Sequence, residues 1–192
     1  MSEMAGRSSI SHKLQSLYFD ITKDSPETQE IMEIVKTMEN EGYQFEAADG
    51  TFRLVVMRRL LNYKSPFSID DIKVIEETRG EGFGASAVIR VSVGDKCEYA
   101  AAEGDGPINA LDKAMRKALE IFYPAISTVK LMDYKVRVID SNTSTAAKVR
   151  VLIESTDGNE TWTTMGVSTD IVEASCMALV DSMEYKLISV KK

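Results

Sequence analysis

The stretch Ile69-Asp-Asp-Ile-Lys-Val74 returns 62 residues later as Leu131-Met-Asp-Tyr-Lys-Val136. A second pair of segments, Ala87-Val-Ile-Arg-Val91 and Ala147-Lys-Val-Arg-Val151, recurs at an offset of 60 residues. Two matches at nearly the same offset indicate an internal repeat. We therefore expect two copies of one structural unit.

Each copy has the pattern of three strands followed by one helix. In the first copy, apolar and polar residues alternate through three segments, and Gly94-Asp95 is a tight-turn signal between the second and the third. Apolar residues at helical spacing then run from Pro107 to Pro124. The predicted strands are 69–77, 85–93 and 96–103.

The second copy repeats this order. Asp157-Gly158 is the matching turn, and a helix begins near Ser168-Thr169-Asp170 and runs toward Leu187. One three-stranded sheet with one helix leaves apolar surface that a second copy can bury. The sequence therefore predicts an α+β fold of two βββα units, at about 67–124 and 128–190, related by a pseudo-twofold axis.

Side-chain alternation predicts how each sheet is oriented. Tyr134, Val136 and Val138 share one face of their strand, whereas Lys135 and Arg137 share the other. We expect each sheet to turn an apolar face toward its helix and a more polar face outward.

The residues before the repeats favour helices. Apolar residues at helical spacing predict one helix that begins near Pro26, and a second with Asp49 as its N-cap that stops before Ser65-Pro66. We therefore expect a helical linker subdomain at 1–65 and a repeat domain at 66–192.

The charge balance excludes some partners. A formal net charge of −7 and a pI near 4.9 disfavour nucleic acid and anionic membranes, which attract basic proteins. The apolar runs are far shorter than the roughly 20 residues of a membrane span, and the first residues lack the pattern of a secretory signal. We expect no nucleic-acid or membrane partner and a cytoplasmic location.

Catalytic groups are scarce. His12, Cys97 and Cys176 have no metal-ligand spacing, so we expect no metal site and no disulfide, and predict that both thiols are buried or half-buried. No nucleophile and base can be paired, so no catalytic residue and no bound cofactor is predicted. Trp162, which falls where Tyr99 falls in the first copy, is expected to pack in the core.

Two glycine-rich stretches are candidates for ligand binding. Gly80 to Gly84 lies between two strands, where a dinucleotide fingerprint lacks its helix, and is expected to be a loop. Ala102-Glu-Gly-Asp-Gly-Pro107 instead joins a strand to a helix start, whose free N–H groups suit a carboxylate. A purely structural turn is the alternative. The equivalent loop of the second copy is Met165-Gly-Val-Ser-Thr-Asp170, and the two helix starts could face one pocket.

Three separated motifs resemble one protein family. Ala102-Glu-Gly-Asp-Gly-Pro-Ile-Asn-Ala-Leu-Asp112, Leu131-Met-Asp-Tyr134 and Gly166-Val-Ser-Thr-Asp-Ile-Val-Glu-Ala-Ser175 are similar to the regulatory domain of 2-isopropylmalate and citramalate synthases. Gly42-Tyr-Gln-Phe-Glu-Ala-Ala-Asp49 resembles the linker of the citramalate synthase branch. Ser2-Glu-Met-Ala-Gly-Arg-Ser8 resembles the end of the segment that follows the family's catalytic barrel.

The resemblance implies a regulatory fragment of an acetyl-CoA-dependent 2-alkylmalate synthase, which does not catalyse by itself. In the family, a separate barrel holds the divalent metal and acetyl-CoA, so we expect no cofactor here. The family's regulatory domain is a homodimer that binds an end-product amino acid at the subunit interface. The citramalate branch, which uses pyruvate and acetyl-CoA, is regulated by isoleucine, which is therefore the effector that we expect. The alternatives are a leucine-binding domain of 2-isopropylmalate synthase, a purely structural dimerisation module, and a catalytic domain of unknown type.

The resemblance also implies which residues bind the effector. Asp105 stands where the family commonly has Asn, and Thr169 stands where it often has Pro. Either Asp105 or Asp133 is expected to meet the ammonium group. The expected effector-binding residues are Gly104, Asp105, Gly106, Ile108, Asn109, Leu131, Tyr134, Val138, Val167, Thr169 and Ile171.

Overall fold

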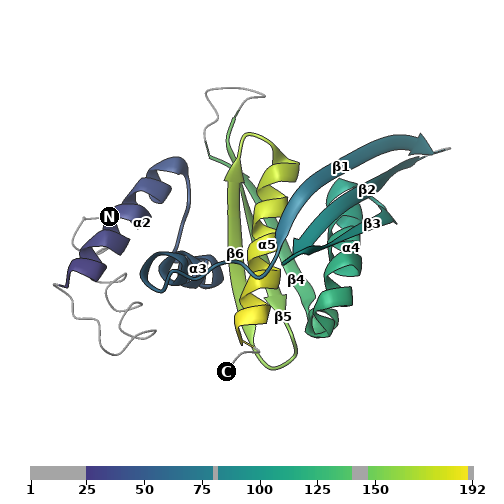
Figure 1. The fold of residues 1–192 in the computed structure, drawn as a ribbon. Helices are drawn as coiled ribbons and strands as arrows, with labels where there is room; N and C mark the ends of the chain where they lie inside the picture. Colours follow the sequence, from purple (N-terminus) through teal and green to yellow (C-terminus); the bar gives the residue numbers. More distant parts are fainter. Residues whose placement is uncertain (1–24, 80–81, 140–146, 190–192) are drawn as a thin grey trace.

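Two antiparallel sheets, each followed by a helix, make up most of the chain (Figure 1). The computed structural model describes residues 25–79, 82–139 and 147–189, so the expectations for residues 1–24 lie outside it. The first unit consists of β1 (Ser68–Arg79), β2 (Gly82–Val93), β3 (Lys96–Gly104) and α4 (Pro107–Phe122). The second consists of β4 (Lys130–Val138), β5 (Val149–Thr156), β6 (Thr161–Ser168) and α5 (Ile171–Ser189), after the short 3-10 helix η1 (Pro124–Thr128). The predicted α+β fold of two βββα units is confirmed.

Irregularities of the strands fall at equivalent places in the two units. The register shifts between Ile69 and Asp71 in β1 and between Leu131 and Asp133 in β4, at the repeat offset found in the sequence. Each third strand also carries a glycine against the helix of its own unit. A Cβ at Gly104 would lie 2.5 Å from the Ala110 backbone nitrogen, and one at Gly166 would lie 2.0 Å from a backbone oxygen of α5. The repeat found in the sequence is therefore also a repeat in the structure.

One prediction about Trp162 is wrong. Trp162 lies on the inner face of β6, whereas Tyr99 lies on the outer face of β3, so the two positions are not equivalent. A slip of one residue moves a side chain to the other face of a strand. Tyr99 is accordingly 61% exposed, whereas Trp162 is 1% exposed and its indole N–H donates to Ser182 Oγ at 3.1 Å. Its expected role in packing is confirmed.

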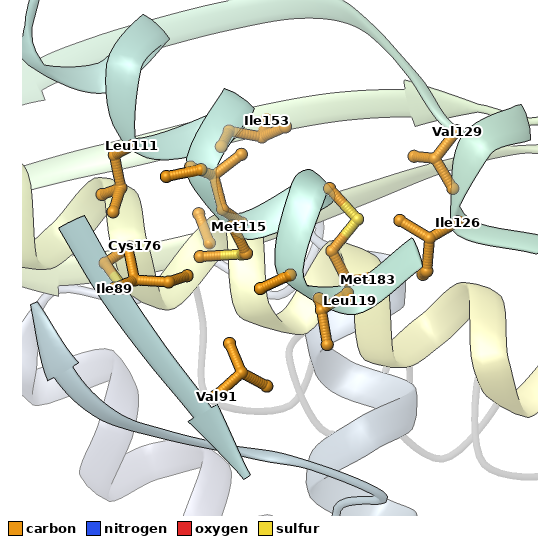
Figure 2. Close-up of a cluster of buried hydrophobic side chains, with 14 of the residues drawn as sticks. Ile89, Val91, Leu111, Met115, Leu119, Ile126, Val129, Ile153, Cys176 and Met183 are labelled. Atoms are coloured by element: carbon orange, nitrogen blue, oxygen red, sulfur yellow. The ribbon is translucent and has the colours of Figure 1, made fainter. Parts of the chain in front are cut away.

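The inner faces of both sheets share one hydrophobic core with α4 and α5. Figure 2 shows Met115 of α4 and Met183 of α5 pointing into the same region as Ile89 of β2 and Ile153 of β5. The two units therefore fold around a common interior, as expected for a repeat whose single copy cannot bury its own apolar surface.

The two repeat helices are buried to different extents. Helix α4 is amphipathic, with Lys113, Lys117 and Ile121 exposed along one face. Helix α5 is buried around nearly its whole circumference, since Asp181 through Ile188 are all buried. No helix in the described part of the chain is both long and apolar enough to cross a membrane.

Helix α3 (Asp49–Leu60) covers the outer edge of β6. Edge strands present unpaired N–H groups, which proteins cover or pair. Here the backbone N–H of Thr163 donates to Asp49 Oδ1 at 3.0 Å, and that of Met165 donates to Thr51 Oγ1 at 2.9 Å. The predicted N-cap role of Asp49 is wrong, because Ala48 is the N-cap and Asp49 binds the sheet edge instead.

A second hydrophobic cluster covers part of the outer face of the second sheet. Helix α2 (Pro26–Glu41) contributes Ile31 and Val35, which join Phe52 of α3 and Met165 of β6. The expected polar outer face is therefore wrong at β6. Leu54 of α3 belongs to the main core, so the core extends across the domain boundary predicted at residue 65, and that division stays a prediction.

Two further expectations are corrected. Gly82 and Gly84 are paired residues of β2 and not loop residues, because the β1–β2 hairpin extends farther than the alternation of apolar residues indicated. Cys97 is exposed on β3, whereas Cys176 is buried in the core as predicted. Burial raises the pKa of the Cys176 thiol to about 11, with the Glu173 charge adding to the shift.

Gly166→Ala should destabilise the fold. The added Cβ would lie 2.0 Å from the Ala174 carbonyl oxygen, so α5 would have to shift away from β6. Overpacking of this kind costs about 1–3 kcal/mol, and we expect a lower Tm by circular dichroism. Gly82→Ala is the control, because a Cβ there meets no atom within 4 Å. Equal Tm values for both variants would contradict the close packing at Gly166.

Candidate functional site

The start of α4 is an open helix N-terminus. Gly106 is the N-cap, no side chain in the described residues caps the helix, and Pro107 occupies the first helical position. The first backbone hydrogen bond runs from the Ala110 N–H to the Gly106 carbonyl at 3.0 Å. The N–H groups of Ile108 and Asn109 precede that bond, so they remain available to an acceptor.

The two glycines of this loop have different roles. Gly104 is enclosed, because a Cβ would lie within 2.7 Å of the Asn109 side-chain oxygen. A Cβ at Gly106 would meet no atom within 4 Å, and the residue has an extended φ of −165° that any amino acid can adopt. Nothing in the fold itself requires glycine at 106, so the space beside it is free for a ligand.

The loop is held in shape by Asn109. Its side-chain oxygen accepts a long hydrogen bond from the Asp105 N–H, at 3.4 Å. The Asp105 side chain remains exposed beside the helix start. A carboxylate at this place is suited to a cationic group on a ligand whose own carboxylate binds the helix N–H groups.

The predicted residues of β4 lie on its inner face. Leu131, Tyr134 and Val138 oppose Ser155, Ile153 and Val149 of β5, all on the side of α5. Tyr134 is half-buried against the core, whereas Leu131 and Val138 are exposed because β4 is the free edge of its sheet. The three side chains therefore share one face, with Leu131 and Val138 near opposite ends of the strand and Tyr134 between them.

Tyr134 connects this strand face to the start of α5. Its hydroxyl lies 2.8 Å from Ser175 Oγ, and Ser175 Oγ also lies 2.6 Å from the carbonyl oxygen of Ile171. Two predicted residues, Tyr134 and Ile171, thus belong to one hydrogen-bonded group. Ser175, at the end of the third sequence motif, was not predicted as a site residue. Its spacing of four from Ile171 was the available signal.

The start of α5 is closed by its own side chains. Asp170 Oδ1 accepts from the backbone N–H of Val172 at 2.7 Å and of Glu173 at 3.2 Å. Ser168 Oγ accepts from the Asp170 N–H at 3.0 Å. The exposed Thr169 lies between these capping residues. The donors of this helix are therefore occupied, and the two helix starts are not chemically equivalent.

Two predicted side chains lie on the opposite face of the second sheet. Val167 opposes Arg150 and packs with the α2–α3 cluster, and a Cβ at Gly42 would lie 3.3 Å from its Cγ1. Asp133 opposes Glu154 and pairs with Lys135, whose hydrogen bond lowers the pKa of the Asp133 carboxyl. Neither can line a pocket with Tyr134, so Asp105 is the better partner for an ammonium group.

The hydrogen bonds of the described residues connect the predicted residues in two groups, one at the α4 start and one that joins β4 to the α5 start. Two cavities in the described part of the chain, one on α4 and one between β1 and α5, are lined by other residues than the eleven predicted ones.

The chain matches a known family and several relatives. Residues 46–187 match the family described as the LeuA allosteric (dimerisation) domain. The (R)-citramalate synthase of Geobacter sulfurreducens is 49% identical over 189 residues, which cover 97% of this chain and 36% of that protein. That of Aquifex aeolicus is 46% identical, over 98% of this chain and 36% of that protein. The 2-isopropylmalate synthase of Aquifex aeolicus is 26% identical, over 96% of this chain and 33% of that protein.

The chain spans about a third of the length of these relatives. The similarity to the citramalate synthases extends over helix α2, which precedes the matched family region, because it covers nearly the whole chain. The N-terminal helices and the repeats therefore occur together in these relatives.

Asp170→Ala should destabilise α5, because the variant leaves the N–H groups of Val172 and Glu173 without their acceptor. Loss of such a cap costs about 0.5–2 kcal/mol, measurable by urea denaturation. Asp170→Asn keeps an acceptor oxygen and should lose much less. Asp105→Ala is the control at the other helix start, where no side chain of the described residues caps the helix. A comparable loss in Asp105→Ala would contradict the difference between the two starts.

Proposed function

The chain belongs to the LeuA allosteric (dimerisation) domain family, and from this membership we propose that it is the regulatory part of an (R)-citramalate synthase, which binds isoleucine and mediates dimerisation. The catalytic reaction, which joins pyruvate and acetyl-CoA, would take place in a part of the protein outside this chain. The higher identity to citramalate synthases than to the 2-isopropylmalate synthase supports this branch.

The open α4 start is the observation on which the proposed binding site rests. An amino acid's carboxylate would accept hydrogen bonds from the free N–H groups at Ile108 and Asn109, where the helix dipole also favours negative charge. Its ammonium group would pair with Asp105. The empty space beside Gly106 allows the ligand backbone to approach the helix without a clash.

The aliphatic side chain of the effector needs an apolar surface, which the inner face of β4 offers. Leu131 and Val138 are exposed there, and Tyr134 lies between them along the strand and is linked through Ser175 to Ile171. Among the described residues no hydrogen bond joins this face to the α4 start. We therefore propose that the complete site lies at a subunit interface, with the two groups contributed by different subunits.

Exposed apolar side chains on β4 support a dimer. Met132 and Val138 are each 60% exposed, and Val136 is also exposed. Apolar residues gathered on a free strand edge commonly mark a protein interface. A symmetric homodimer would cover this edge in both copies at once.

Isoleucine should bind more tightly than leucine. The two ligands differ only in where one methyl group branches, so an apolar pocket discriminates by roughly 10- to 200-fold. Isothermal titration calorimetry measures both affinities. Stronger binding of leucine would favour the alternative, the regulatory domain of a 2-isopropylmalate synthase. Absence of binding by either would favour a purely structural dimerisation module.

Gly106→Val should abolish most isoleucine binding without unfolding the chain. The new side chain fills the space beside the helix start but meets no atom within 4 Å at its Cβ. We expect affinity to fall at least about tenfold, with little change in Tm. Gly82→Val is the matched control, in equally open surroundings on β2. Unchanged affinity in Gly106→Val would place the effector elsewhere.

Met132→Lys should weaken the dimer. A lysine at this exposed β4 position would bury a charge in the proposed interface, and we expect the dimer dissociation constant to rise about tenfold or more. Light scattering over a dilution series measures it. Ile121→Lys on the exposed face of α4 is the control. A monomeric mass for the unaltered chain at micromolar concentration, with and without isoleucine, would refute the dimer itself.

A further inference from the structure

Two arginines stand directly opposite each other on the outer face of the second sheet. Arg137 of β4 and Arg150 of β5 are paired in the register of the two strands. The side chains of directly opposite residues share one face, with Cβ atoms about 4.5–5.5 Å apart, and like charges at such positions are destabilising. Burial lowers the pKa of Arg150, and the Arg137 charge lowers it further. The two guanidinium groups are therefore close enough to repel each other.

The hydrogen-bond partners of Arg150 bring no negative charge. Its Nε donates to the Gly42 carbonyl oxygen at 2.6 Å, and its Nη1 donates to Gln44 Oε1 at 2.7 Å. Lys148, two residues earlier and on the same face, donates to the backbone carbonyl oxygen of Glu41 at 3.5 Å. All three acceptors are oxygens of neutral amide groups, so they do not offset the repulsion.

Arg137 is exposed and forms no hydrogen bond or ion pair with another residue of the described ranges. The acidic residues nearby on this face act on a different cation. The hydrogen bond to Asp133 raises the pKa of Lys135, and the Glu154 charge adds to that shift. Within the described part of the chain, Arg137, Lys148 and Arg150 thus form a cluster of three cations without a paired carboxylate.

A structural role accounts for only one member of this cluster. Arg150 holds the end of helix α2, since Gly42 is the C-cap of that helix. This contact fixes the guanidinium group in place and uses two of its five N–H donors, so three remain available. The contact gives no reason for a second arginine at position 137, where the like charge weakens the strand pair.

We propose that Arg137 and Arg150 bind one phosphate group, to which Lys148 contributes a third positive charge. Guanidinium groups bind phosphate through paired N–H donors, and a phosphate has enough oxygens to accept from both arginines. The chain carries a net charge of −7, which disfavours a long polyanion. The site therefore suits inorganic phosphate or a small phosphate monoester. It is independent of the proposed effector site, and either can fail without the other.

Calorimetry and thermal unfolding with inorganic phosphate test the ligand class. A ligand that binds only the folded state raises its stability by mass action, so we expect millimolar phosphate to raise the Tm more than sodium chloride of equal ionic strength. Methyl phosphate distinguishes the two sources, because tighter binding than inorganic phosphate assigns a monoester and weaker binding assigns the free ion. A phosphate effect no larger than that of chloride would overturn the proposal.

Arg137→Gln should have two opposite effects. Without phosphate the Tm should rise, because the repulsion of Arg150 is removed, while phosphate affinity should fall at least about tenfold. Lys73→Gln is the control, since it removes an exposed cation from β1 that lies opposite the uncharged Val88. Unchanged affinity in Arg137→Gln, the same loss in Lys73→Gln, or a lower Tm of Arg137→Gln without phosphate would each refute the assignment.

NMR of the arginine side chains locates the bound phosphate. In ¹⁵N-labelled protein, phosphate should shift the Nε–H signal of Arg150. The Nε–H signal of Arg116, which donates to Asp112 on α4, should not move. Binding that leaves the Arg150 signal unshifted would place the phosphate outside this cluster.

Discussion

The last turns of helix α5 leave no side to water, and this constraint determines the arrangement around it. Its last turns are buried on every side, so neighbours must surround it. Sheet β4–β6, α4 and α3 all contact it. One βββα unit supplies only one of these neighbours, because a sheet covers one face of a helix. The first unit, through α4, and the linker helix α3 therefore belong to the same folded body as α5.

This central position makes the two units chemically different although their sequences repeat. Helix α4 has one face in the core and one in solvent, and its N-terminus is left without a side-chain cap in the described residues. Helix α5 begins with Asp170 bound to its first N–H groups. Within the second sheet the two edge strands differ as well. Helix α3 covers β6, whereas β4 has exposed apolar side chains. Ligand binding and dimerisation are therefore suited to the α4 start and the β4 edge.

Local sequence signals predicted the elements well, because glycine, proline and apolar periodicity act over a few residues. The turns at Gly94-Asp95 and Asp157-Gly158 and the α4 start at Pro107 were all found this way. The signals could not tell which face of a strand a neighbour covers. Val167 is an apolar residue in the alternating pattern of β6, which suggests a place in the main core. It faces the α2–α3 cluster instead, because those helices pack on the outer side of the sheet.

Polar contacts between residues far apart in the sequence could not be predicted from these signals either. Asp49 has the pattern of an N-cap, and only the position of β6 in space makes it a partner of Thr163. The charged cluster of Arg58, Asp181 and Glu184 had a weak signal, since Asp181 and Glu184 stand among apolar residues in the second half of α5. Their partner lies on α3, more than 120 residues away. For the site, the α4 start was predictable from local sequence, but the contact of Tyr134 with Ser175 was not.

The same charged cluster restricts how a regulatory signal could leave the repeats. Breaking a buried ion pair costs about 3–5 kcal/mol, toward the lower end here because the Arg58 side chain is 39% exposed. Allosteric coupling typically supplies about 1–3 kcal/mol, so an effector could not readily separate α3 from α5. Helix α2 contacts α3 mainly through apolar side chains such as Ile31 and Phe52, which can shift against each other without unpairing a buried charge. A change in α5 would therefore carry α3 with it, and relative movement would occur between α3 and α2.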